Sequence, residues 1–274
     1  EYAPIEQFHI FGVNTFKIQH TVNAVIEFLF FSNSEKKKVY LMRHYVNFFA
    51  GFLALIIFYK ILRLNYNKII SLTGVLFFIT NPKFVAEIIY NPNDVWFMYF
   101  VIFFIFSSIN YFKKRKEKYL YFIVVSIALA INVRIIGLYL YPVFFIIYLI
   151  NNNFKISKNE FKKLFKQLIV FLIILVILTP QLWYDPYSIF YSIFGTLEFK
   201  TFNPKILFLG NMFNSSDLPR YYLPLWILIS TPLLVIILFT FGLLYFFKNI
   251  KIDINKNLKK TDLIIFFLVF IIPF

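Results

Sequence analysis

The residues of this sequence that could do chemistry are a few polar side chains set between long apolar stretches. The tetrapeptide Asn91-Pro92-Asn93-Asp94 comes just before an apolar run that starts at Trp96. A carboxylate there could contact a substrate. It could equally serve as the N-cap of the following helix, since an Asp oxygen accepts hydrogen bonds from free helix N–H groups. Both interpretations of Asp94 stay open from the sequence.

Arg134 is the position at which the sequence points most sharply to function. It interrupts an apolar segment, residues 131–137, and a permanent cation beside hydrocarbon is costly unless it has a partner or reaches water. A guanidinium suits two-point binding of a phosphate, whereas a long side chain can also extend to the membrane surface as an anchor. We expect a phosphate contact at Arg134, with anchoring as the alternative, and Gly137 permits a close backbone approach nearby.

Other polar and aromatic residues stand at the ends of the predicted membrane segments. These candidate binding residues are Arg43, His44, Asp185, Arg220, Tyr221 and Tyr222. Each of them can contact a lipid headgroup or a sugar, or can anchor the chain at the membrane surface, where Tyr and Trp are commonly enriched. For Arg43, His44 and the tyrosines, anchoring is the stronger interpretation.

Several classes of chemistry have no support in the sequence. There is no Cys, so a disulfide framework, a thiolate metal site and a cysteine nucleophile are excluded. No His pair has metal-ligand spacing, and there is neither a Gly-rich phosphate loop nor a Gly-x-Ser-x-Gly motif. We therefore predict no cofactor and no metal site, and leave the use of a divalent metal open. The carboxylates that could act as a general base are Glu1, Glu6, Asp94, Asp185, Glu198 and Asp217.

The elements that carry these residues are predicted to be membrane helices. Hydrophobic residues make up 60% of the chain, the mean hydropathy is +0.73, and some apolar runs exceed the roughly 20 residues that cross a bilayer as helix. The sequence predicts an all-α, polytopic transmembrane helical bundle with seven or eight membrane segments. The expected helices lie near 41–59, 69–82, 96–112, 119–133, 135–150, 164–183, 222–247 and 263–274.

The placement of charge gives this bundle an orientation. Most of the 28 Lys and Arg residues fall in four loops, 60–68, 112–118, 151–163 with Lys166, and 248–262. One alternating topology places all four in the cytoplasm, as the positive-inside rule requires, and explains the net charge of +15 without nucleic acid. The outer face then receives residues 1–40, a loop at 81–95 and the loop 184–221.

We expect a single transmembrane domain over residues 1–274. It divides into an outer-face segment at 1–40, a helical core at 41–183, an outer loop at 184–221 and C-terminal helices at 222–274. Because the chain begins at Glu1 and its last apolar run stops at Phe274, we expect a fragment that lacks its N-terminal part and is truncated at the C-terminal helices.

Five motifs, taken in order, resemble those of bacterial glycosyltransferase family 39, membrane proteins with the GT-C fold. They are Glu1-Tyr2-Ala3-Pro4, Arg43-His44, Asn91-Pro92-Asn93-Asp94-Val95-Trp96-Phe97, Asn132-Val133-Arg134-Ile135-Ile136-Gly137 and Tyr221-Tyr222-Leu223-Pro224-Leu225-Trp226. The family includes the protein O-mannosyltransferases and the lipid A aminoarabinose transferase. The resemblance implies transfer of a sugar from a polyprenyl-phosphate carrier to a glycan, lipid or protein acceptor on the extracytoplasmic face of the bacterial plasma membrane.

The resemblance also implies roles for particular residues. Arg134 would contact the carrier phosphate, Asn91 and Asp94 would line the same cavity, and Tyr221 and Tyr222 would close it near the donor sugar. The family's usual catalytic Asp lies in the first outer loop, of which residues 1–4 match only the end. We therefore expect the base upstream of Glu1, with Asp94 as the alternative, and an inactive fragment.

Two other functions remain as alternatives from the sequence. A transporter or flippase of a lipid-linked sugar would also place Arg134 and aromatic rings beside a polar membrane cavity. Transporters commonly have a broken helix in each of two related halves, whereas this sequence has one candidate break, near Arg134. A structural membrane subunit, in contact only with membrane lipids, is the third possibility.

Overall fold

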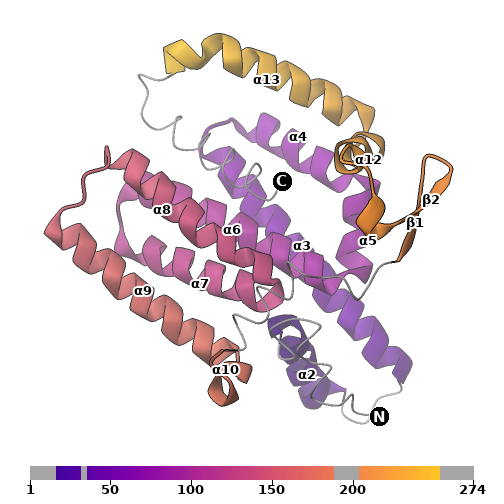
Figure 1. Ribbon diagram of the computed structural model, residues 1–274, viewed down its shortest axis with the longest axis horizontal. Helices are drawn as coiled ribbons and strands as arrows, with labels where there is room; N and C mark the ends of the chain where they lie inside the picture. Colours follow the sequence, from indigo (N-terminus) through magenta and orange to yellow (C-terminus); the bar gives the residue numbers. More distant parts are fainter. Residues whose placement is uncertain (1–16, 32–35, 188–203, 254–274) are drawn as a thin grey trace.

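The computed structural model describes residues 17–31, 36–187 and 204–253, which form a mainly helical protein (Figure 1). The elements are α2 (Ile18–Phe30), α3 (Lys36–Arg63), α4 (Lys68–Ile79), α5 (Pro82–Tyr90), α6 (Pro92–Lys114), α7 (Glu117–Val133), the 3-10 helix η1 (Ile135–Tyr139), α8 (Leu140–Asn151), α9 (Lys158–Leu178), α10 (Gln181–Tyr184), β1 (Lys205–Phe208), β2 (Asn211–Asn214), η2 (Ser215–Asp217), α12 (Tyr222–Ser230) and α13 (Leu233–Asp253). The predicted helical architecture is confirmed.

Two local predictions are wrong. The all-α class omits an antiparallel hairpin in which β1 pairs with β2, from Lys205 opposite Asn214 to Phe208 opposite Asn211. Its two-residue turn requires positive φ, which Gly210 adopts at 83° without steric cost. The predicted loop at 81–95 is in fact α5 and the first turn of α6. The polar residues of this segment have the hydropathy of a loop, but in the structure they start helices. In each of two Asn-Pro pairs, Asn is the N-cap and Pro is the first helical residue.

The helices alternate in direction, so the bundle has two distinct ends. At one end the loops after α3, α6 and α8 meet, and hydrogen bonds join Lys113 to Asn65 and Arg115 to Asn152. We call this the lysine-rich end. At the other end the start of α6 meets the end of α7, and the end of α7 meets the end of α9 through Asn132 and Leu178. The basic loops 60–68, 112–118 and 151–163, which the sequence places on one side of the membrane, all lie at the lysine-rich end.

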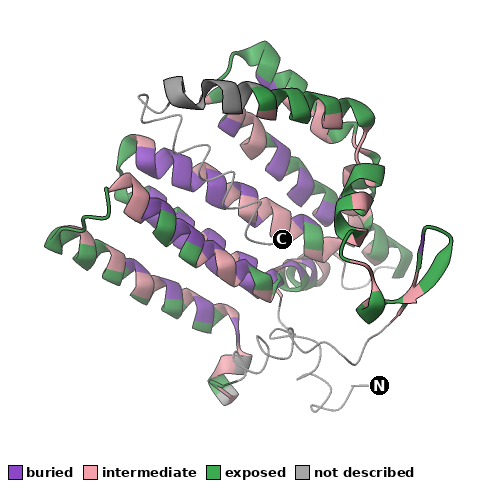
Figure 2. Ribbon diagram, turned by 45° about the horizontal axis from the view of Figure 1, so that its top comes forward, coloured by how far each residue is buried: buried purple, intermediate pink, exposed green. Residues whose placement is uncertain are grey.

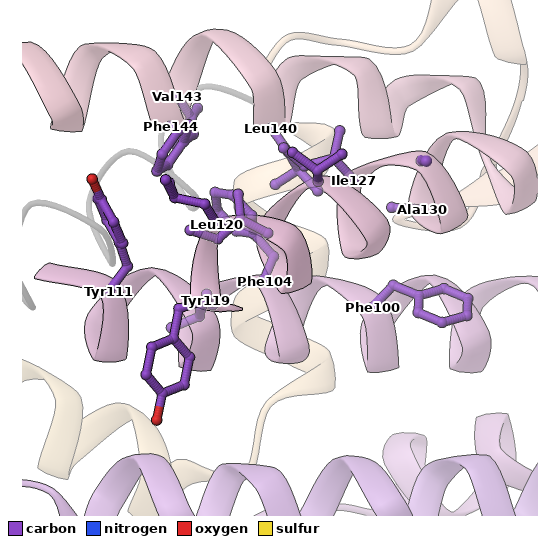
Figure 3. Close-up of a cluster of buried hydrophobic side chains, with 14 of the residues drawn as sticks. Phe100, Phe104, Tyr111, Tyr119, Leu120, Ile127, Ala130, Leu140, Val143 and Phe144 are labelled. Carbon is purple, nitrogen blue, oxygen red and sulfur yellow. The ribbon is translucent and has the colours of Figure 1, made fainter. Parts of the chain in front are cut away.

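The core is formed mainly by α6, α7 and α8 (Figure 3). Ile127 and Ala130 of α7 and Leu140 of α8 have no exposed surface, and Tyr111 of α6 stacks on Tyr148 of α8 at 6.3 Å between ring centroids. Away from this core, residues 233–244 of α13 are mostly exposed, as the colours of Figure 2 show. Its exposed side chains include Leu233, Phe239 and Phe241, an apolar surface that suits lipid rather than water.

Within the described ranges, two helices are long and apolar enough to cross a membrane, α3 and α6. The number rises to four if α4 with α5, bent by 67°, and α12 with residues 233–244, bent by 113°, each form one span. The predicted total of seven or eight is larger because it also counts α7, which has 17 residues, the shorter apolar segment Ile135–Asn151, and α9, which carries lysines through its first half. The predicted segment 263–274 lies outside the described residues.

Replacement of Gly137 by Ala is expected to disturb the turn that follows α7. A Cβ at Gly137 would lie 2.7 Å from the carbonyl carbon of Ala130 and 2.8 Å from the backbone nitrogen of Ile131, and backbone atoms cannot move aside cheaply. We expect Gly137→Ala to destabilise the protein by about 1–3 kcal/mol, measured as a lower thermal midpoint in detergent. Gly242→Ala is the control, because a Cβ there meets nothing within 4 Å. Equal midpoints for the two variants would contradict the proposed close approach.

Candidate functional site

Asp94 lies in the first turn of α6, where two side chains hold its carboxylate. Its Oδ1 accepts a hydrogen bond from Nη2 of Arg134 at 2.6 Å, and its Oδ2 accepts one from Nδ2 of Asn91 at 2.5 Å. The cap of α6 is Asn91, whose Oδ1 accepts from the backbone N–H of Asp94 at 3.2 Å. Asp94 is thus not the N-cap, and its charge is directed to Arg134.

Arg134 is placed by the break between two helices. α7 ends at Val133, Arg134 is extended with φ −141° and ψ 123°, and the 3-10 helix η1 begins at the next residue. The side chains of Arg134 and Asp94 are 44% and 51% exposed. An ion pair this exposed stabilises a fold by only about 0–1 kcal/mol. Both charged groups therefore remain open to a ligand, and the pair is a weak contributor to the fold.

Lys17, at the start of α2, brings a second cation to the same turn. Its Nζ donates to Oδ1 of Asn93 at 3.2 Å, and Nε2 of Gln19 donates to the same oxygen at 2.7 Å. Burial lowers the pKa of Lys17, the nearby Arg134 charge lowers it further, and Asp94 acts in the opposite direction. The Lys17 ammonium is therefore partly dehydrated and repelled by a second cation, two conditions that a bound anion would relieve.

Asn132 ties three chain segments together next to Arg134. Its Oδ1 accepts from the backbone N–H of Ile18 at 2.7 Å, and its Nδ2 donates to the carbonyl of Leu178 at 2.7 Å. The side chain is buried, with 1% of the residue exposed. Asn132 thereby fixes the start of α2 and the end of α9 against α7, and so positions Lys17 near Arg134.

The carboxylate of Asp94 also borders a cavity of about 560 Å³. The cavity is open on one side and lies between α4, α5, α6 and α13. Its lining residues are Gly74, Phe77, Phe78, Asn81, Lys83, Phe84, Glu87, Asp94, Val95, Met98 and Val235. Aromatic and aliphatic side chains make up most of the wall, and four polar residues interrupt it. Such a lining suits a ligand with one polar part and one apolar part.

The other predicted site residues have different surroundings. Arg43 pairs with Glu27 of α2 at 2.9 Å, and Nδ1 of His44 donates to the carbonyl of Ile89 at 2.6 Å. Asp185 accepts from the backbone N–H of Tyr187 at 3.0 Å. Within the described ranges, no hydrogen bond, ion pair or ring contact joins any residue of the set Arg43, His44, Asp185, Arg220, Tyr221 and Tyr222 to Asp94 or Arg134.

Tyr221 and Tyr222 instead pack on the hairpin. Their rings lie 5.9 Å and 5.0 Å from the ring of Phe208, measured between centroids. The structure thus brings together Asn91, Asp94 and Arg134 from the predicted set and places the tyrosines with β1.

Sequence reasoning missed Lys17 and Asn93 as site residues and quoted Asn132 only as part of a motif. The sequence does contain a signal for Lys17. It directly precedes the helix 18–30, in which Gln19 and Asn23, four positions apart, place two buried polar side chains on one face. Three of the carboxylates considered as a general base, Glu1, Glu6 and Glu198, lie outside the described residues. Across the described part of the chain, no three His, Asp or Glu side chains form a group that could hold a metal ion.

No curated protein and no solved structure matches this chain significantly. A family model described as dolichyl-phosphate-mannose-protein mannosyltransferase matches residues 25–184. The match includes Asn91, Asp94, Asn132 and Arg134, and ends before the hairpin and its tyrosines. Because it spans more than half of the chain, this membrane protein belongs to the dolichyl-phosphate-mannose-protein mannosyltransferase family, whose glycosyltransferases use a lipid-phosphate-linked sugar as donor.

Proposed function

We propose that this chain binds a polyprenyl-phosphate-linked sugar with the phosphate at Arg134 and Lys17, and serves its transfer to an acceptor hydroxyl. The observation that carries the proposal is the approach of these two cations, from different elements, to the Asn93-Asp94 turn. Arg134 uses one guanidinium nitrogen on Asp94, and a guanidinium has further N–H groups for a phosphate. Asn91 orients Asp94, which in turn orients Arg134.

Charge placement supports the sidedness of this site. α7 carries Glu117 in its first turn, at the lysine-rich end, and Arg134 directly after its last residue. If the lysine-rich loops are cytoplasmic, as the positive-inside rule favours, Arg134 lies on the extracytoplasmic face of the bacterial plasma membrane. We extend this to a GT-C bundle of seven or eight membrane segments. In this bundle α7, η1 together with α8, and α9 each form a further span.

The proposed chemistry is an inverting transfer. A carboxylate of the outer segments takes the proton of the acceptor hydroxyl, the acceptor oxygen bonds to the anomeric carbon, and the bond from that carbon to the carrier phosphate breaks. Lys17 and Arg134 stabilise the negative charge that develops on the leaving phosphate. Asp94 already binds Arg134 and Asn91, so we assign it a positioning role and place the base outside the described residues.

The two cations make a measurable difference to carrier binding under this proposal. We expect Arg134→Ala to weaken binding of polyprenyl monophosphate about 10- to 100-fold, since a hydrogen bond to a charged group contributes about 1.5–3 kcal/mol. Arg134→Lys should restore only part of this because it lacks the guanidinium fork. Binding is measured with the chain in nanodiscs. The control is Arg63→Ala, because Arg63 lies at the lysine-rich end, where it donates to the carbonyl of Tyr66. Equal losses in Arg63→Ala and Arg134→Ala would refute the assignment.

Transfer is tested with radiolabelled polyprenyl-phosphate sugars in liposomes that contain the full-length protein, because the fragment alone is expected to be inactive. Arg134→Ala and Asp94→Asn are both expected to lower sugar release by at least tenfold while the thermal midpoint stays near that of the unaltered chain, because the exposed pair contributes only about 0–1 kcal/mol to the fold. Protein-dependent movement of the intact lipid across the bilayer, without sugar release, would support the alternative of a transporter or flippase instead.

Carrier binding should also depend on pH through Lys17. Burial and the charge of Arg134 lower the pKa of Lys17 from its ordinary value of 10.5, so the ammonium loses its proton at a lower pH than other lysines do. Polyprenyl monophosphate is already fully ionised above pH 7, since its second pKa is about 6. Affinity should therefore fall as pH rises from 7 toward 10.5. Lys17→Arg should remove this fall, and an identical pH profile in both proteins would contradict the role of Lys17.

A further inference from the structure

A second basic pocket lies at the lysine-rich end, between the start of α7 and the first half of α9. Its volume is about 230 Å³, and its lining residues are Glu117, Leu120, Lys162, Lys163, Lys166 and Gln167. Since α7 has 17 residues and a helix rises about 1.5 Å per residue, Glu117 is separated from Arg134 by roughly 25 Å. The pocket is therefore distinct from the proposed donor site, and its argument does not depend on that site.

The charges of the pocket are only partly balanced by protein groups. Lys163 forms an ion pair with Glu117 at 3.0 Å, and the Lys166 ammonium lies over the ring of Tyr121, 5.9 Å from its centroid. None of the hydrogen bonds or ion pairs between described residues involves Lys162. Three ammonium groups thus face one carboxylate, and an anion bound among them would offset the excess positive charge.

The surface beside the pocket indicates where the rest of such a ligand would lie. Apolar side chains continue the row of Lys162 and Lys166 along α9, at the helical spacing of three to four residues. They are Ile173 and Ile177, which are 53% and 62% exposed. This row runs from the pocket toward the apolar second half of α9. Acyl chains fit such a surface, and a soluble phosphate would make no use of it.

From these observations we propose that the pocket between α7 and α9 binds the phosphate of an anionic membrane lipid, one whose headgroup carries no cation. The phosphate lies among Lys162, Lys163 and Lys166, and the acyl chains lie along the row of Ile173 and Ile177. A choline or ethanolamine headgroup would bring its own cation against three lysines. Basic pockets on the cytoplasmic side of membrane helices commonly bind anionic headgroups.

The test compares lipids bound to the purified chain by native mass spectrometry after equilibration with defined mixtures. Each Lys near an anionic headgroup contributes about 1 kcal/mol, so the chain should retain phosphatidylglycerol over phosphatidylethanolamine by on the order of tenfold. The double variant Lys162→Ala/Lys166→Ala should lose this preference. Lys155→Ala/Lys158→Ala, which removes the same charge from neighbouring exposed positions outside the pocket, is the matched control and should keep it.

The proposal is overturned if the control pair loses as much binding as the pocket pair. Displacement of the lipid by millimolar inorganic phosphate would also overturn it, because the site would then be one for a soluble anion.

Discussion

The buried amide of Asn132 is the contact on which the arrangement of the candidate donor site depends. Helix ends carry backbone N–H and C=O groups without partners, and in a site enclosed by other helices these must be satisfied by side chains. Asn132 satisfies one of each, the N–H of Ile18 and the carbonyl of Leu178. The first turn of α2 is thereby fixed next to α7. Lys17, one residue before α2, reaches Asn93 only because this turn is held in place.

The two ends of the bundle use charge in different ways. At the lysine-rich end, contacts such as Lys163 with Glu117 and Lys113 with Asn65 join loops that are close in space, and many lysines remain exposed to solvent. At the opposite end, Lys17 is partly dehydrated beside Arg134. A dehydrated cation binds phosphate more strongly than a hydrated one, because less water has to be removed when the anion arrives. Binding of the donor phosphate is therefore proposed at the end that holds this partly dehydrated cation.

The sequence predicted the helical architecture and singled out Asp94 and Arg134 because each leaves a local signal, whereas their place in one cavity was implied by the family resemblance. Apolar runs mark helices in lipid, and a single Arg between apolar residues marks a polar contact. The hairpin at 205–214 gave no such signal, since its strands are only four residues long. Lys17 was missed for another reason. Its partner Asn93 is 76 positions away, and the sequence of one protein contains no record of which distant residues meet.

The placement of Asp94 limits which reaction role it can take. Its carboxylate accepts from Arg134 on one oxygen and from Asn91 on the other. A general base takes up the proton that it removes, and a proton on Asp94 would remove the charge that holds Arg134. We therefore propose that the base is another carboxylate, so that the two functions are divided between residues. This division fits the proposed mechanism, in which the cation that stabilises the leaving phosphate must stay in place while the acceptor is deprotonated.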